Sequence, residues 1–98
     1  MNQTEKAKKI IDSTKGKTFT VSFYKKNGER RTMNGRTGVT KYVKGTGKSS
    51  DDPELVIVHD MVKHADRYVN LKSIVNIRFG GKVHEIRSEQ EAYEGRRV

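Results

Sequence analysis

The sequence of 98 residues contains no cysteine, no tryptophan and a single proline. The lack of cysteine excludes disulfide scaffolds, thiolate zinc sites, iron–sulfur clusters and cysteine nucleophiles. Aromatic residues make up 7% of the chain, which is too few for a broad base-stacking platform. Hydrophobic residues make up 32%, well below the roughly 45–50% of ordinary globular chains, so part of the chain is expected to stay outside a packed core.

Long apolar segments are lacking as well. No run approaches the roughly 18 apolar residues of a membrane span, and the first residues, MNQTEKAKKIID, lack the apolar region of a secretory signal. We therefore expect a soluble protein of the cytoplasm with no membrane contact. The length supports one small domain, which we place at residues 1–87, followed by a polar C-terminal tail at 88–98.

Charge is abundant, and it is distributed unevenly. The formal net charge is +9. Residues 1–48 carry 13 lysines and arginines against 3 acids, whereas residues 49–98 carry 8 against 9, so the halves have net charges of +10 and −1. If the basic residues belong to folded elements, they form a fixed positive patch that attracts phosphate groups.

The residues after position 17 predict a β-hairpin. Apolar and polar side chains alternate with a period of two, which is typical of a half-buried strand, and Asn27-Gly28 marks the following turn. A three-residue loop with Gly28 in the left-handed conformation pairs Val21 with Met33 and keeps the apolar side chains on one face. The same register places Arg30 beside Tyr24 on the outer face.

The remaining patterns predict a mainly β fold. Short strands recur at intervals of about 8–15 residues with one flanking helix and no βαβ alternation, which indicates a small antiparallel SH3-like or Sm-like barrel of about five strands with one short N-terminal helix. The expected elements are a helix over about residues 5–14 that is capped by Thr4 and ended by Gly16, a long basic loop at about 34–54, strands at 55–58 and 67–71, a final strand or hairpin broken at Gly80-Gly81, and a short helix or frayed tail from 88.

Several motifs in this order resemble those of a known family. They are Lys25-x-x-Gly28, the run Arg31-x-Met33-Asn34-Gly35-Arg36-x-Gly38-Val39-x-Lys41-Tyr42-x-Lys44-Gly45, a strand that ends in Asp60, and the segment Arg67-Tyr68-x-x-Leu71-x-x-Ile74. Together they resemble the small SH3-like barrel proteins encoded by tailed bacteriophages, over about residues 17–79. The last segment is also similar to the closing strand of WYL domains, which are built on an Sm-like barrel. The resemblance implies an SH3-like barrel, a phage origin and the cytoplasm of a bacterial host, and it supplies no mechanism.

The most basic segment, residues 25–48, holds eight lysines and arginines against the single acid Glu29. Lysine neutralises phosphates, arginine grips phosphate or stacks on bases, and glycine lets backbone N–H groups approach an anion. We therefore predict that nucleic acid, either DNA or RNA, is the partner and that the hairpin and loop contact its phosphate backbone. The candidate nucleic-acid-binding residues are Lys25, Lys26, Arg30, Arg31, Arg36, Lys41, Tyr42, Lys44 and Lys48.

Other interpretations of the basic segment stay open. The low aromatic content and the implied phage origin favour a phage effector that binds and modulates a host or phage protein without catalysis, for example by adding a strand at a barrel edge. The segment is alternatively a solvated loop whose charge serves solubility. The segment 88–98 is nearly balanced in charge, so we expect its removal to change nucleic-acid binding little.

No pattern typical of catalysis or metal binding stands out, so we predict a protein that is not an enzyme and has no cofactor. Residues 35–38 match the G-x-x-G spacing of KH domains but follow a strand, and residues 44–48 lack the spacing of a phosphate loop. The imidazole and carboxylate side chains fit no metal site by spacing. We predict loop or solvent-facing positions for all of them: His59, Asp60, His64, Asp66, His84 and Glu85.

Overall fold

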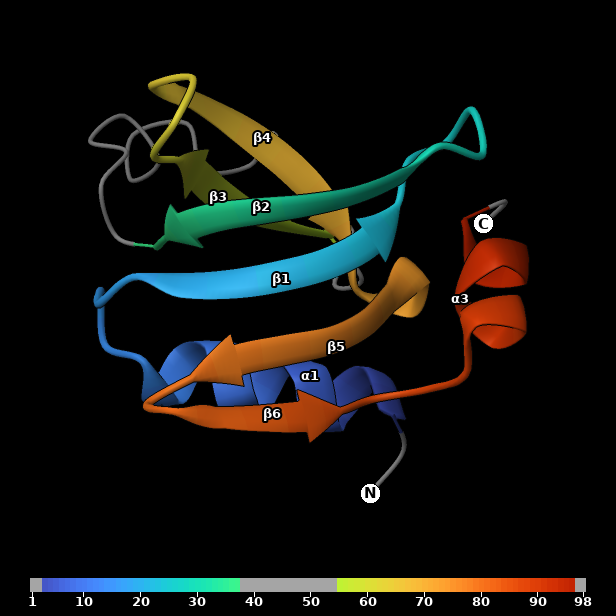
Figure 1. Ribbon diagram of the computed structural model, residues 1–98, viewed down its shortest axis with the longest axis horizontal. Coiled ribbons are helices and arrows are strands. Elements are labelled where there is room, and N and C mark those ends of the chain that lie inside the picture. The colour runs from blue at the N-terminus through green and yellow to red at the C-terminus, as the bar shows by residue number, and fades with distance from the viewer. Residues whose placement is uncertain (1–2, 38–54, 97–98) are drawn as a thin grey trace.

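The structure, a computed structural model, describes residues 3–37 and 55–96 (Figure 1). Within these residues, six antiparallel strands form one open sheet in the order β4-β3-β2-β1-β5-β6, together with two α-helices and one 3-10 turn. The prediction of a mainly β, antiparallel fold is confirmed, whereas the barrel of about five strands is matched only in part. The elements are α1 (Gln3–Ser13), β1 (Phe19–Tyr24), β2 (Arg30–Arg36), β3 (Leu55–Asp60), β4 (Ala65–Asn70), η2 (Leu71–Ser73), β5 (Ile74–Phe79), β6 (Lys82–Glu85) and α3 (Glu89–Gly95).

The hairpin of β1 and β2 has the predicted register. Val21 lies opposite Met33, and both side chains are buried. Gly28 adopts a φ of +94°, the left-handed conformation that the three-residue loop requires. The backbone N–H of Lys25 donates to the carbonyl of Glu29 at 2.8 Å and closes this loop. Local sequence signals therefore set the hairpin correctly.

Strands β2 and β3 are joined over a short length. They pair only at Gly35 with Asp60 and at Arg36 with His59, whereas β3 pairs with β4 along its whole length. A Cβ atom on Gly35 would overlap the side chain of Val58 and would lie 2.8 Å from the carbonyl oxygen of His59, so only glycine permits this approach. Figure 1 shows β3 and β4 turned behind β2, while α1 lies behind β5 and β6.

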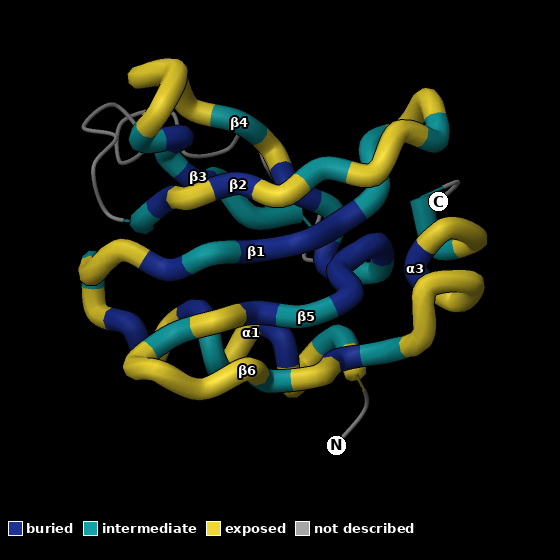
Figure 2. The backbone as a smooth tube through the Cα atoms, viewed as in Figure 1, coloured by how far each residue is buried: buried dark blue, intermediate teal, exposed yellow. Residues whose placement is uncertain are grey.

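The turn η2 returns the chain from β4 to β5 and completes the core. The side chain of Asn70 accepts a hydrogen bond from the backbone N–H of Lys72 at 2.8 Å and caps this turn. Arg87 donates to the carbonyls of Leu71 and Ile74 at 2.6 and 2.9 Å. Figure 2 shows the buried residues concentrated along β1 and β5. The apolar core consists of Ala7, Ile11, Phe19, Val21, Phe23, Met33, Val58, Val69, Leu71, Ile74, Ile77 and Ile86.

Both ends of the described chain are helical. Helix α1 begins at Gln3, so Thr4 lies inside the helix and is not the cap that was expected; Gly16 follows the end of the helix with a φ of +86°. The segment after residue 88, for which a helix and a frayed tail were both open, forms α3. Ser88 and Glu91 make a capping box at its start, and Ala92 is fully buried. No helix among the described residues is long and apolar enough to cross a membrane.

Candidate nucleic-acid interface

The structure brings together only some of the predicted site residues. Lys25, Lys26 and Arg31 lie at the closed end of the β1–β2 hairpin and line one cleft. Arg36 lies at the opposite end of β2, six residues beyond Arg30 and therefore about 20 Å away along the strand. The remaining predicted residues lie outside the described part of the chain: Lys41, Tyr42, Lys44 and Lys48.

The cleft has a volume of about 560 Å³ and lies between the hairpin end and strand β4. Five of the residues that line it are cations, and Asp66 is the one acid among the described lining residues. Aromatic and aliphatic side chains complete its walls. The lining residues are Phe23, Tyr24, Lys25, Lys26, Arg31, Leu55, Asp66, Arg67, Tyr68, Asn70 and Arg96.

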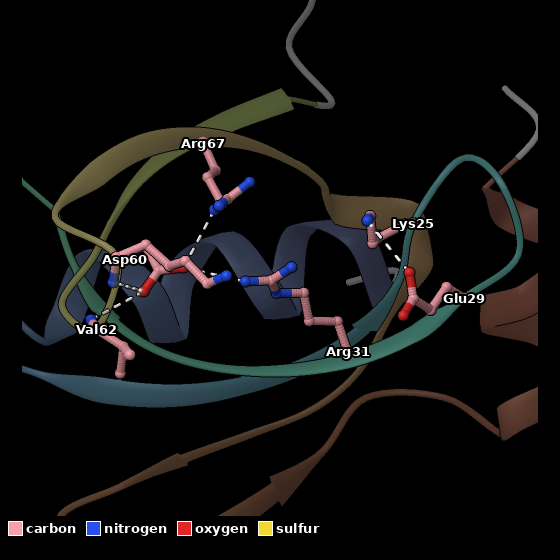
Figure 3. A network of polar contacts seen from close by, with 7 residues as sticks. Lys25, Glu29, Arg31, Asp60, Val62 and Arg67 are labelled. Atoms are coloured by element: carbon pink, nitrogen blue, oxygen red, sulfur yellow. Dashed lines mark hydrogen bonds and ion pairs between the residues drawn. The ribbon is translucent and has the colours of Figure 1, made fainter.

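Two of these cations are held by a buried carboxylate. Asp60 Oδ2 accepts from Arg31 Nη2 at 3.4 Å and from Arg67 Nε at 3.1 Å, and the Asp60 side chain is 2% exposed. Its Oδ1 accepts from the backbone N–H groups of Val62 and Lys63 at 2.9 and 3.0 Å. Figure 3 shows Arg31 and Arg67 pointing at Asp60 from β2 and β4, so one carboxylate links three strands.

The position of Asp60 corrects the expectation that it lies in a solvent-facing place. Burial alone would raise the pKa of Asp60, but the N–H donors of Lys63 and Val62 and the guanidinium of Arg67 outweigh burial and lower it. Asp60 therefore stays ionised at neutral pH. Its negative charge balances part of the positive charge of the cleft, and the arginines it holds act first as structural residues.

The structure places Arg30 outside the cleft, in an ion pair. Arg30 Nε and Nη2 donate to the two carboxylate oxygens of Glu89 at 2.8 and 2.9 Å, and Tyr24 Oη donates to the same carboxylate at 2.9 Å. The hydrogen bonds from Arg30 are the main cause that lowers the pKa of Glu89, and the same pair raises the pKa of Arg30. Arg30 therefore presents a neutralised group to an approaching phosphate.

Helix α3 adds a cation to the cleft that the sequence did not single out. The ring of Tyr93 packs edge-on against Tyr24, with ring centroids 5.4 Å apart. Arg96 lies over the Tyr93 ring, 4.1 Å from its centroid, and donates to the carbonyl of Lys26 at 3.1 Å. Arg96 belongs to the segment that we expected to contribute little, and it lines the cleft beside Lys26.

Arg67 is the second cation of the cleft that the sequence analysis did not predict. Its position in the Arg67-Tyr68 segment was noted only for the resemblance. Because successive side chains of a strand point to opposite faces, the pair gives no clear local signal of a shared surface. No such signal exists for Arg96 either, because its approach to Lys26 joins residues 70 positions apart.

The imidazole and carboxylate groups form no metal cluster within the described residues. His59 Nδ1 and Asp66 Oδ1 lie 2.9 Å apart, and this pair stands beside the cleft. Comparison with known proteins found no matching family model, no matching curated protein and no matching solved structure. The interpretation of the cleft therefore depends on its own chemistry.

Proposed function

We propose that this protein binds nucleic acid at the cationic cleft, mainly through the phosphate backbone and without catalysis. The observation that carries this proposal is the set of five cations around one concave surface. Counting the lining acid Asp66 and the neighbouring acids Asp60 and Glu29, which pair with Arg31, Arg67 and Lys25, the site keeps a net charge of +2. Such a surface attracts a polyanion and releases its counterions.

The order of the elements supports the proposed SH3-like or Sm-like barrel. Among the described residues, strands β1 to β5 follow an N-terminal helix and lie in the order β4-β3-β2-β1-β5, and a 3-10 turn connects β4 to β5. Strand β6 then adds an edge beyond the five expected strands. A barrel of this kind, encoded by a bacteriophage and acting in the cytoplasm of its host, remains our proposal for the origin of the chain.

A salt titration tests the proposed function. If about 4–6 phosphates are contacted, the logarithm of the binding constant falls against the logarithm of the salt concentration with a slope of roughly −3 to −5. The measurement is fluorescence anisotropy of a labelled oligonucleotide. A complete lack of binding at low salt rejects the proposal, and a protein partner that is retained after nuclease treatment favours the effector hypothesis.

A charge-matched pair of variants assigns the binding to the cleft. Lys25→Gln/Lys26→Gln/Arg96→Gln removes three lining cations, so affinity falls about tenfold or more and the salt slope becomes shallower by about 2–3. The control, Lys9→Gln/Arg78→Gln/Lys82→Gln, removes three exposed cations from α1, β5 and β6 and gives the same net charge. Equal losses in the two variants would show that net charge, and not the cleft, drives binding.

A further inference from the structure

The volume of the cleft restricts the class of ligand further than its charge does. Its volume of about 560 Å³ lies within the range of about 300–1,000 Å³ that is typical of sites for small molecules. The phosphates of a duplex lie on the outside of a convex rod, so their recognition needs no cavity. A base of a duplex enters a cavity only after it is flipped out of the stack, whereas an unpaired base has no base pair to break.

The walls of the cleft contain apolar as well as charged side chains. Leu55 at the start of β3 and the Phe23 side chain at the end of β1 contribute apolar surface. Tyr68, which also lines the cleft, is 49% exposed. An anion gains nothing from the apolar surfaces of these groups, but a flat aromatic base gains stacking and burial against them.

The polar groups of the cleft complement both parts of a nucleotide. Lys25, Lys26 and Arg96 stand on the hairpin side, where the Arg96 guanidinium is fixed by Tyr93. On the β4 side, Asn70 lines the cleft, and its side-chain oxygen accepts from the Lys72 backbone, which fixes the orientation of the amide. A ligand with a phosphate at one end and a base at the other fits this division.

We propose that the cleft holds one unstacked nucleotide of a single strand, with its base against Tyr68 and Leu55 and its flanking phosphates on Lys25, Lys26 and Arg96. This inference rests on the proposed function and narrows its ligand from nucleic acid in general to single strands. An extended acidic peptide is the competing class of ligand. The exposed aromatic and aliphatic surface favours the nucleotide, because acidic side chains have no flat apolar face.

The test uses the full chain and three labelled probes of equal length, about 15 nucleotides: oligodeoxythymidine, the same strand with abasic sites at its central positions, and a duplex. We expect oligodeoxythymidine to bind about tenfold tighter than the duplex and the abasic strand to lose about fivefold or more. Tyr68→Ala lowers the affinity for oligodeoxythymidine by about fivefold or more, removes the difference between the intact and abasic strands, and leaves the salt slope unchanged.

The possible outcomes separate this inference from the proposed function. If all three probes bind with equal affinity and the same salt dependence, and Tyr68→Ala has no effect, the proposal of a nucleotide in the cleft is wrong. The proposed binding to phosphates then still stands. A lack of binding to every probe overturns both. If polyglutamate of equal charge competes as effectively as oligodeoxythymidine, the proposed nucleotide ligand is wrong and an acidic peptide is favoured. Tyr68→Phe keeps the aromatic ring and removes only the hydroxyl group. It is the matched control for stacking, and we expect it to retain the affinity of the parent.

Discussion

Replacing Asp60 by asparagine should destabilise the fold far more than any other single loss of a described carboxylate charge. The substitution keeps the shape of the side chain and an oxygen that accepts from the backbone N–H groups of Val62 and Lys63. It removes the negative charge that Arg31 and Arg67 share. The two guanidinium groups, whose side chains are 25% and 35% exposed, then face each other without a counter-charge.

The size of the effect follows from burial. Removing one partner of a buried ion pair costs about 3–5 kcal/mol, and a hydrogen bond to a charged group contributes about 1.5–3 kcal/mol. Because Arg31 and Arg67 keep partial access to water and asparagine keeps its backbone contacts, we expect a loss of about 2–3 kcal/mol. For a chain of this length that loss lowers the melting temperature by about 10–20 °C.

Urea unfolding followed by circular dichroism measures this loss, with Asp12→Asn as the control. Asp12 is exposed on α1 and lies 3.8 Å from Lys8, so its loss should change the free energy of unfolding by less than about 0.5 kcal/mol. If Asp60→Asn unfolds within about 0.5 kcal/mol of the control, the carboxylate does not hold the three strands together and the reasoning fails.

Three further predictions concern acid, the β2–β3 crossing and the C-terminus. The pKa values of Asp60 and Glu89 are lowered in the folded protein, so their ionised forms contribute fully to the free energy of unfolding above the unfolded pKa near 4, and this contribution is lost as the pH falls through the folded pKa values. Urea titrations should therefore show similar stability at pH 7 and pH 5 and a clear loss at pH 3. The loss at pH 3 should be smaller in Asp60→Asn. Gly35→Ala should cost about 1–3 kcal/mol in thermal unfolding, because its methyl group overlaps Val58. Truncation after Arg87 should weaken oligonucleotide binding in anisotropy measurements and reduce the salt slope by about one, because Arg96 leaves the cleft.

The parts of the fold that sequence reasoning predicted are those that local residues decide. The alternation from Phe19 to Phe23 and the glycine at position 28 give the strand, the turn and the register within one short segment, and the structure confirms all three. Gly16 ends α1 for a similarly local reason. For residues 74–86 the sequence left a strand and a hairpin broken at Gly80-Gly81 both open, and the structure has the hairpin of β5 and β6. Local pattern did not decide between them, because β6 is short and mostly exposed.

The joining of β2 to β3 depends on contacts that local patterns do not contain. The crossing of β2 and β3 needs a glycine beside Val58 and the carbonyl of His59, and Gly35 is far from both in sequence. An aspartate at the end of an apolar strand usually indicates a turn facing solvent. Here the aspartate at the end of β3 is buried, because Arg31 and Arg67 reach it from two other strands.

The number of lysines and arginines in the sequence overestimates the number of cations that are available for binding. Lys25 and Lys26 lie where the hairpin register places them, beside the cleft. Arg30 also follows the predicted register, but Glu89, 59 positions later, neutralises it through two hydrogen bonds. Pairing of this kind depends on where α3 docks, and that position follows from the burial of Ala92 and not from any pattern near Arg30.

The cations of the cleft therefore divide into two groups with different consequences for experiments. Arg31 and Arg67 are bound to a buried carboxylate, so their replacement changes the stability of the fold together with any effect on binding. Lys26 is exposed and Lys25 pairs with the exposed Glu29 at 3.3 Å, so their replacement changes the stability by less than about 0.5 kcal/mol. If the lysine variants lose affinity while their stability is unchanged, the loss is due to the missing contacts with the ligand. The same loss in an arginine variant is informative only when its unfolding curve is measured alongside, since Arg31 and Arg67 line the cleft and also hold Asp60.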